Sequence, residues 1–181
     1  GDSITTQLLM IKGLDMNPVY LWLTEQALIG KITGNLHIIR TDFQDYRKEM
    51  KVIQDSLENE YLFRLATDLS QEIDDLIIKN VNIFTVEATL KRNQDVWVHK
   101  DKIRAIVPNT QSMEYGNDAR IIDGTGKTLM PGMFDMHTHN TKFRGALHLA
   151  GGITSVRDLA NNKQVKALSH QFNSNQIIGP R

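Results

Sequence analysis

The chain has 181 residues, of which 40% are hydrophobic and 23% are charged, a balance typical of a folded globular protein and not of a disordered one. Its 21 basic and 21 acidic residues cancel, so the net charge gives no support to nucleic acid or an anionic membrane as a partner. Because cysteine is absent, disulfides, thiolate zinc sites and cysteine nucleophiles are excluded. Any bound metal must therefore be held by His, Asp, Glu or a modified lysine.

Targeting signals are missing from the sequence. No apolar run approaches the roughly 20 residues that span a bilayer, and the start Gly1-Asp2-Ser3 has neither the basic region nor the apolar run of a signal peptide. We therefore expect a soluble protein without membrane contact, either cytoplasmic or exported (for example periplasmic). The start also lacks Met, which suggests a processed or cut end.

The first 74 residues are predicted to be helical. Asn17-Pro18 is a helix-start signal, and Thr41 with Gln44 forms a capping-box pattern. Apolar residues then recur at spacings of three and four, which is one face of a helix: Phe43, Tyr46, Met50, Ile53 and Leu57. We expect a helical N-terminal segment over 1–74, a small bundle or cap without recognisable chemistry.

Residues 75–130 have the residue pattern of a small β-domain. Short β-branched and aromatic runs alternate with polar or glycine-containing turns, which predicts a mostly antiparallel sheet. The runs are 76–78, 81–84, 96–98, 103–107, 120–123 and 127–130, with Lys100-Asp101-Lys102 as one of the turns.

From residue 131 to 181 the pattern changes to strand–helix–strand–helix–strand. The expected strands lie at 133–136, 153–156 and from Ile177 onward, and the expected helices at 143–150 and 164–172. This order is typical of the opening of a parallel α/β sheet or (β/α)8 barrel. The predicted class is thus α/β, with the first βα units of a TIM-type barrel after a β-domain and a helical segment.

His137-Thr138-His139 ends the first of these strands. Residues two apart on a strand point to the same face, so the two imidazoles project together. Such a pair suits one divalent metal, and metal-bound water becomes a nucleophile near neutral pH. Zinc, iron and manganese all accept imidazole, so the pair does not identify the metal; zinc is the metal that we expect, with iron or manganese as alternatives. Asp135 precedes His137 by two, so we expect it on the same face, supporting the strand end without binding metal.

The run Ile122-Asp123-Gly124 to His137-Thr138-His139 resembles the signature of the metal-dependent amidohydrolase superfamily, and within it the imidazolonepropionase-like branch. Upstream, 76–81 and 96–106 resemble the small β-domain of this family; downstream, 150–159 and 178–181 resemble its second and third barrel strands. The resemblance covers about residues 75–181, the N-terminal part of such an enzyme, and leaves the first 74 residues unexplained.

The resemblance implies that His137 and His139 are the first-strand ligands of the more buried metal. Arg157 and Asp158 would lie near the barrel mouth, where a structural ion pair or a surface loop is as open an interpretation as a role in the site. The remaining histidines are expected to be structural or exposed: His37, His99, His148 and His170.

The sequence departs from the family in the ligands that later strands supply. A site of this kind also needs a carboxylated lysine or glutamate, two further histidines and an aspartate base, so the catalytic residues are unknown here. A barrel takes about 250 residues, and only about 50 follow Pro131. We therefore expect an incomplete barrel, a fragment that is inactive alone and pairs with the remainder of the barrel or forms a homo-oligomer.

Two functions from different classes follow. The first is a metal-dependent amidohydrolase that cleaves carbon–nitrogen bonds other than ordinary peptide bonds with metal-activated hydroxide, acting on a small amide, cyclic amide or dipeptide-like substrate. The alternative is a non-catalytic helical interaction module with a vestigial barrel fragment. A nucleic-acid or structural zinc site is disfavoured by the balanced charge and the missing cysteines.

Overall fold

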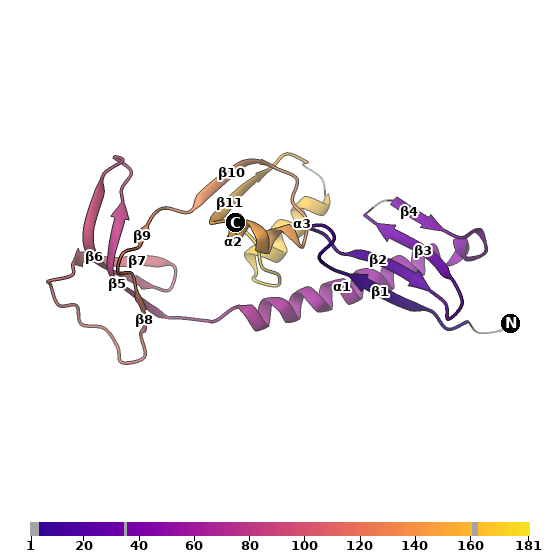
Figure 1. Cartoon of the computed structure of the whole chain (residues 1–181), viewed down its shortest axis with the longest axis horizontal. Coiled ribbons are helices and arrows are strands. Elements are labelled where there is room, and N and C mark those ends of the chain that lie inside the picture. The colour runs from indigo at the N-terminus through magenta and orange to yellow at the C-terminus, as the bar shows by residue number, and fades with distance from the viewer. Residues whose placement is uncertain (1–3, 35, 161–162) are drawn as a thin grey trace. The chain divides into compact units, whose positions relative to one another are not determined.

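The computed structural model describes residues 4–34, 36–160 and 163–181. The chain divides into two compact units (Figure 1). Unit 1 combines Gly1–Leu69 with Met133–Arg181, and unit 2 is Ser70–Gly132. Within the described ranges, no helix is both long enough and apolar enough to span a membrane.

The N-terminal part of unit 1 begins with a four-stranded antiparallel sheet in the order β1-β2-β3-β4. Its strands are β1 (Gln7–Ile11), β2 (Val19–Leu23), β3 (Leu28–Thr33) and β4 (Leu36–Ile39). The prediction of a helical segment is therefore wrong for these residues, including the helix start at Asn17-Pro18. Tyr20 and Trp22 are buried on one face of β2, but the residues that alternate with them, Val19, Leu21 and Leu23, are apolar too, which hides the alternation of a strand.

A 3-10 turn, Thr41–Tyr46, leads into the long helix α1 (Arg47–Leu69), so the helical periodicity after Thr41 predicted this element correctly. The helix packs on the sheet through a core of five buried side chains. They are Trp22, Ile29, Ile32, Phe43 and Met50.

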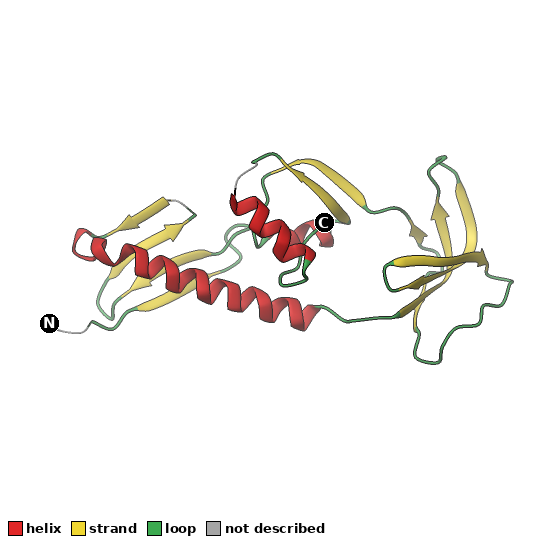
Figure 2. Ribbon diagram, turned by 180° about the vertical axis from the view of Figure 1, so that it is seen from behind, coloured by secondary structure: helices red, strands yellow, loops and turns green. Residues whose placement is uncertain are grey.

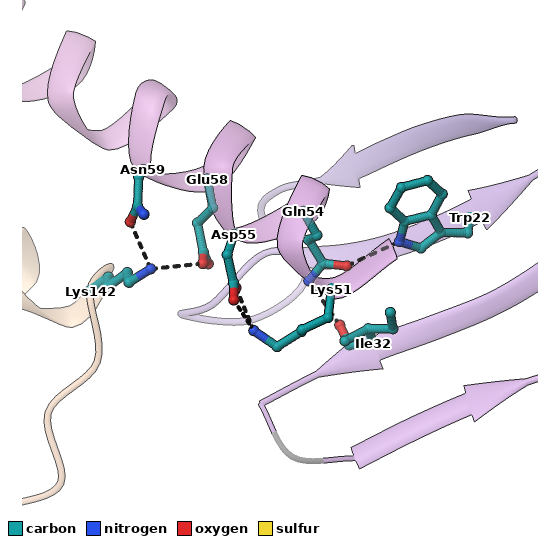
Figure 3. A network of polar contacts seen from close by, with 8 residues as sticks. All are labelled: Trp22, Ile32, Lys51, Gln54, Asp55, Glu58, Asn59 and Lys142. Carbon is teal, nitrogen blue, oxygen red and sulfur yellow. Dashed lines mark hydrogen bonds and ion pairs between the residues drawn. The ribbon is translucent and has the colours of Figure 1, made fainter. Parts of the chain in front are cut away.

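Gln54 ties α1 to the sheet from within this core (Figure 3). Its side chain is 4% exposed; its Oε1 accepts a hydrogen bond from the Trp22 indole N–H at 3.2 Å, and its Nε2 donates to the Ile32 carbonyl at 3.2 Å. Both partners are buried, so neither could turn to water if the amide were removed.

Gln54→Leu keeps the volume but leaves the indole N–H and the Ile32 carbonyl unpaired. We expect it to lower the free energy of unfolding by about 1–3 kcal/mol, measured by urea denaturation followed by Trp fluorescence. Gln44→Leu, at an exposed position before the helix, is the matched control and should stay near wild type. Equal stability of the two variants would contradict the role of the Gln54 amide.

Unit 2 is a five-stranded sheet with the path β7-β6-β5-β8, and β9 also pairs with β5. The predicted runs all overlap strands, with 76–78 and 81–84 joined in one: β5 (Asp75–Phe84), β6 (Leu90–His99), β7 (Lys102–Pro108), β8 (Arg120–Asp123) and β9 (Thr128–Leu129). The pairs of β5 with β6 and of β6 with β7 are antiparallel, whereas β8 and β9 run parallel to β5.

Asp75 closes one end of this sheet. Its Oδ1 accepts a hydrogen bond from the Trp97 indole N–H at 2.6 Å. The same oxygen lies 2.8 Å from His99 Nδ1. The Trp97 bond, followed by the His99 bond, lowers the pKa of Asp75 below its ordinary value. A carboxyl group whose pKa is lower in the folded state stabilises the fold above its unfolded pKa, and that contribution is lost as the pH falls through the folded value.

Wild type is therefore expected to lose more stability than Asp75→Asn when the pH falls from 5.5 to 3. Urea denaturation at the two pH values measures the difference. Asp118→Asn, at an exposed aspartate of the same unit, should keep the wild-type pH dependence. If Asp75→Asn showed the same acid sensitivity as wild type, the carboxylate would not be the stabilising group.

The C-terminal part of unit 1 is a parallel strand pair with two helices. It comprises β10 (Met133–Thr138), α2 (Arg144–Ala150), β11 (Ile153–Asp158) and α3 (Lys163–Asn173). In both views α2 and α3 lie on the same side of the two strands (Figures 1 and 2). The four elements appear where the sequence predicts them, which is the βαβα order of a barrel opening.

The third predicted strand does not form at Ile177. Ile177 is buried with Leu62, Leu168 and Phe172, in a core shared by α1 and α3. Strand pairing starts instead at Arg181, whose N–H donates to the Thr154 carbonyl at 3.0 Å and whose carbonyl accepts the Val156 N–H at 3.1 Å. This parallel pattern occupies the free edge of β11.

Candidate metal centre

The two histidines of the His-x-His strand project together from the end of β10. His137 and His139 are both exposed, whereas Thr138 between them is 7% exposed. The two imidazole centroids lie 5.7 Å apart with the ring planes at 77°. Two adjacent exposed imidazoles are donors that divalent zinc, iron and manganese accept.

A bulge in β10 decides which face the pair occupies. Asp135 is opposite Val156 and Thr138 is opposite Asp158, so β10 uses one residue more than β11 over this stretch. Residues directly opposite one another point to the same side of a sheet, which places Asp135 with Thr138. His137 and His139 therefore point to the other side.

Asp135 is thus on the opposite face from the histidines, and the prediction of a shared face is wrong. Its Oδ2 lies 3.7 Å from Nε2 of His148, which belongs to α2, so Asp135 faces the helices. Its Oδ1 accepts the His137 backbone N–H at 3.0 Å. The Asp135 side chain therefore supports the strand end, as expected, but from the face opposite the two histidines.

Arg157 and Asp158 likewise point to opposite faces of the strand pair. The alternation of β11 puts Arg157, which is exposed, on the face of the histidines. Asp158 turns to the helix side and fixes the loops, accepting the Asn140 N–H at 2.7 Å and the Ala160 N–H at 2.8 Å. Arg157 therefore shares the face of the histidines, whereas the Asp158 carboxylate bonds the backbone of the two adjacent loops.

The other four histidines lie elsewhere. His99 bonds Asp75 in unit 2, His148 packs behind β10 with 14% of its side chain exposed, His37 is in β4 and His170 is in the last turn of α3. None of them joins the pair at His137. In the ranges that the structure describes, no group of three or more His, Asp or Glu side chains could hold a metal together.

Sequence reasoning missed one residue next to the pair. Arg144, the first residue of α2, donates from Nη1 to the His139 carbonyl at 3.2 Å. This bond ties the loop after β10 to the helix that follows. Its only sequence signal is a cation placed shortly after the His-x-His strand.

A cavity of about 610 Å³ in unit 1 reaches the loop after β10. Its wall includes His139 and Asn140 of that loop, and residues of β2, α1 and α3. Lys142 crosses to α1 beside the cavity, with its Nζ 2.7 Å from Asn59 Oδ1 and 3.3 Å from Glu58 Oε2 (Figure 3). Lys142 therefore fixes the loop after β10 to α1, and His139 contributes to the cavity wall while both imidazoles remain exposed to solvent.

Comparison with known proteins gives partial matches. No family model matches the chain. A dihydroorotase from Halalkalibacterium halodurans is 34% identical over 106 residues, which cover 53% of this chain and 24% of the relative. A 5'-deoxyadenosine deaminase from Methanococcus aeolicus is 40% identical over 68 residues, which cover 35% of this chain and 16% of the relative. The chain thus spans a quarter or less of the length of these curated relatives.

Solved structures share the fold of the matched region. A protein assigned as a prolidase from Bifidobacterium longum superposes with a TM-score of 0.54 and 28% identity over 61% of this chain and 30% of its own. Molinate hydrolase superposes with a TM-score of 0.54 and 19% identity, over 62% of this chain and 30% of its own. In sequence and in fold, the chain thus resembles the N-terminal part of amidohydrolase-superfamily proteins.

Proposed function

We propose that the chain supplies the first two metal ligands, His137 and His139, of an amidohydrolase that cleaves carbon–nitrogen bonds other than ordinary peptide bonds. The observation that carries this proposal is the exposed imidazole pair at the end of β10, with ring centroids 5.7 Å apart, on the face opposite Asp135 and His148 of α2. In a (β/α)8 barrel that side faces the interior, and active sites lie at the carboxyl ends of the strands. The imidazolonepropionase-like branch is part of the same proposal.

The metal, zinc by preference, would supply an activated hydroxide and polarise the carbonyl group of the substrate. His137 and His139 would hold it from one strand. Stable sites use three or four protein donors, so the remaining ligands and the base would come from later barrel strands. We therefore propose that the chain works together with those strands and is inactive without them.

The proposed substrates are small amides, cyclic amides or dipeptide-like molecules. Support comes from the names of the similar proteins, which include dihydroorotases, a prolidase and molinate hydrolase. Arg157 lies on the histidine face, where a cation favours a substrate that carries a carboxylate.

The proposal is tested with the double variant His137→Ala/His139→Ala. Zn²⁺ titration of the 181-residue chain, followed through the histidine ring resonances by NMR, should show weak binding at this pair that disappears in the double variant. In a protein that joins this chain to the later barrel strands, the double variant should lose both bound metal and turnover. His170→Ala, at the far end of α3, is the control and should change neither.

Turnover that survives in the double variant would reject the proposal. The alternative, a non-catalytic interaction module, was based on a helical N-terminal segment. Because β1, β2, β3 and β4 form a sheet, the premise of that alternative is weakened.

A further inference from the structure

The feature that goes beyond this proposal is the irregular pairing of β10 just before the histidines. Between Asp135 and Thr138 the strand carries one residue more than β11, so the regular ladder is interrupted at Met136 and His137. A bulge leaves backbone groups without a partner in the neighbouring strand. Here the N–H of His137 bonds the Asp135 carboxylate at 3.0 Å instead.

The bulge has a consequence for side-chain direction. The side-chain period of a strand is two, so adding one residue sends every later side chain to the opposite face. Without the bulge, His137 and His139 would share the face of Asp135, which lies toward His148 of α2. With it, both imidazoles are exposed on the open side and Thr138 is buried on the helix side.

We propose that Asp135 is a positioning residue for the metal pair: its carboxylate holds the bulge through the His137 amide and thereby keeps both imidazoles on the open face. Three observations converge on this role. The carboxylate oxygen accepts a hydrogen bond from the His137 amide, which lies in the stretch where the pairing with β11 is irregular. Asp135 itself stays on the helix side, where it cannot share a metal with the pair. Directly after the bulge the pairing with the next segment resumes, because the Leu159 N–H donates to the Thr138 carbonyl at 3.3 Å.

The inference rests on the proposed metal role of the pair, and two kinds of measurement separate them. The first is structural and needs no metal: amide hydrogen exchange of His137 in the 181-residue chain. In wild type this amide should be protected although its side chain is exposed. It should stay protected in Asp135→Asn, whose amide oxygen can still accept the bond, and lose protection at least tenfold in Asp135→Ala.

The second measurement is Zn²⁺ affinity, followed through the ring resonances of the two histidines. Asp135→Ala should bind Zn²⁺ at least tenfold more weakly than wild type, whereas Asp135→Asn should stay within about threefold, in line with the 10–100-fold effects of groups that support metal ligands. Asp123→Ala is a matched control, because Asp123 makes the same kind of bond to the amide two residues on, Thr125, at 2.9 Å in unit 2.

The outcomes are distinguishable. Wild type that binds no Zn²⁺ at the pair, with a protected His137 amide, would overturn the proposed metal function and leave the bulge assignment standing. Binding by wild type and Asp135→Ala with equal affinity would overturn the positioning role alone. If Asp135→Ala does not fold, two other results would reject the inference. One is free exchange of the His137 amide in folded wild type. The other is a loss of Zn²⁺ binding in Asp135→Asn as large as that of the histidine variant.

Discussion

Gly179→Ala is expected to lower the free energy of unfolding of unit 1 by about 3 kcal/mol, the upper range for overpacking a core. A Cβ at this position would overlap three carbons of the Phe172 ring, and that ring is 4% exposed in the core with Leu62, Leu168 and Ile177. The ring cannot move away without opening this core, and the backbone of Gly179 is held because Arg181 pairs with β11 two residues later.

Thermal or urea unfolding of the variant measures the loss. Gly151→Ala is the matched control, because a Cβ there would lie 3.5 Å from the nearest carbonyl oxygens, an ordinary contact. Gly151→Ala should be neutral or slightly stabilising, since alanine reduces the entropy of the unfolded chain. A Gly179→Ala protein as stable as Gly151→Ala would show that the close approach to Phe172 is not a constraint.

Asp95→Ala is expected to destabilise unit 2 by about 2–3 kcal/mol, measured by urea denaturation with Trp97 fluorescence. The Asp95 side chain is 3% exposed; its Oδ2 accepts from Lys79 Nζ at 2.8 Å and its Oδ1 accepts the Asn80 N–H at 2.7 Å. Lys79 is 35% exposed and can turn to water, so most of the cost comes from the Asn80 amide and the vacated space.

The Asn80 amide matters because the backbone there is unusual. Asn80 has a φ of 52°, in the left-handed region, and marks a register shift between Ile78 and Val81 in β5. Asp95→Asn keeps an acceptor for this amide and should cost less than Asp95→Ala. Asp118→Ala at an exposed site should be silent, and an Asp95→Ala variant that is equally silent would contradict the prediction.

The sequence predicted the elements between residues 75 and 173 because clear turn signals separate them. Lys100-Asp101-Lys102, Gly124 and Gly151-Gly152 separate short apolar runs whose lengths suit strands or helices. The helix from Arg47 was predicted from a different signal, the spacing of three and four between its apolar residues.

The first sheet was missed because both faces of its strands carry apolar side chains. In β2 the buried Tyr20 and Trp22 alternate with Val19, Leu21 and Leu23, which are half-buried, so the run has no polar positions to reveal a period of two. A short continuous apolar run fits a helix or a strand equally well. Asn17-Pro18, a helix-start signal in isolation, then decided the prediction wrongly.

The candidate site could be predicted only in part. The identity of the histidines and their common direction follow from the period of a strand. Which face they take depends on the bulge at Met136 and His137, and a bulge is set by pairing with β11 and by the Asp135 carboxylate. Neither is visible in the alternation of residues, so Asp135 was placed on the wrong face.

Unit 1 is discontinuous, because its halves Gly1–Leu69 and Met133–Arg181 are separated by all of unit 2. Joining them requires closing a loop over the intervening chain, and such contacts of high sequence separation slow folding. Unit 2 is contiguous, and in it β5 and β6 are joined by a short turn. We therefore expect unit 2 to acquire native hydrogen-exchange protection first after dilution from denaturant, with β10, β11 and the histidine pair ordered in a later phase.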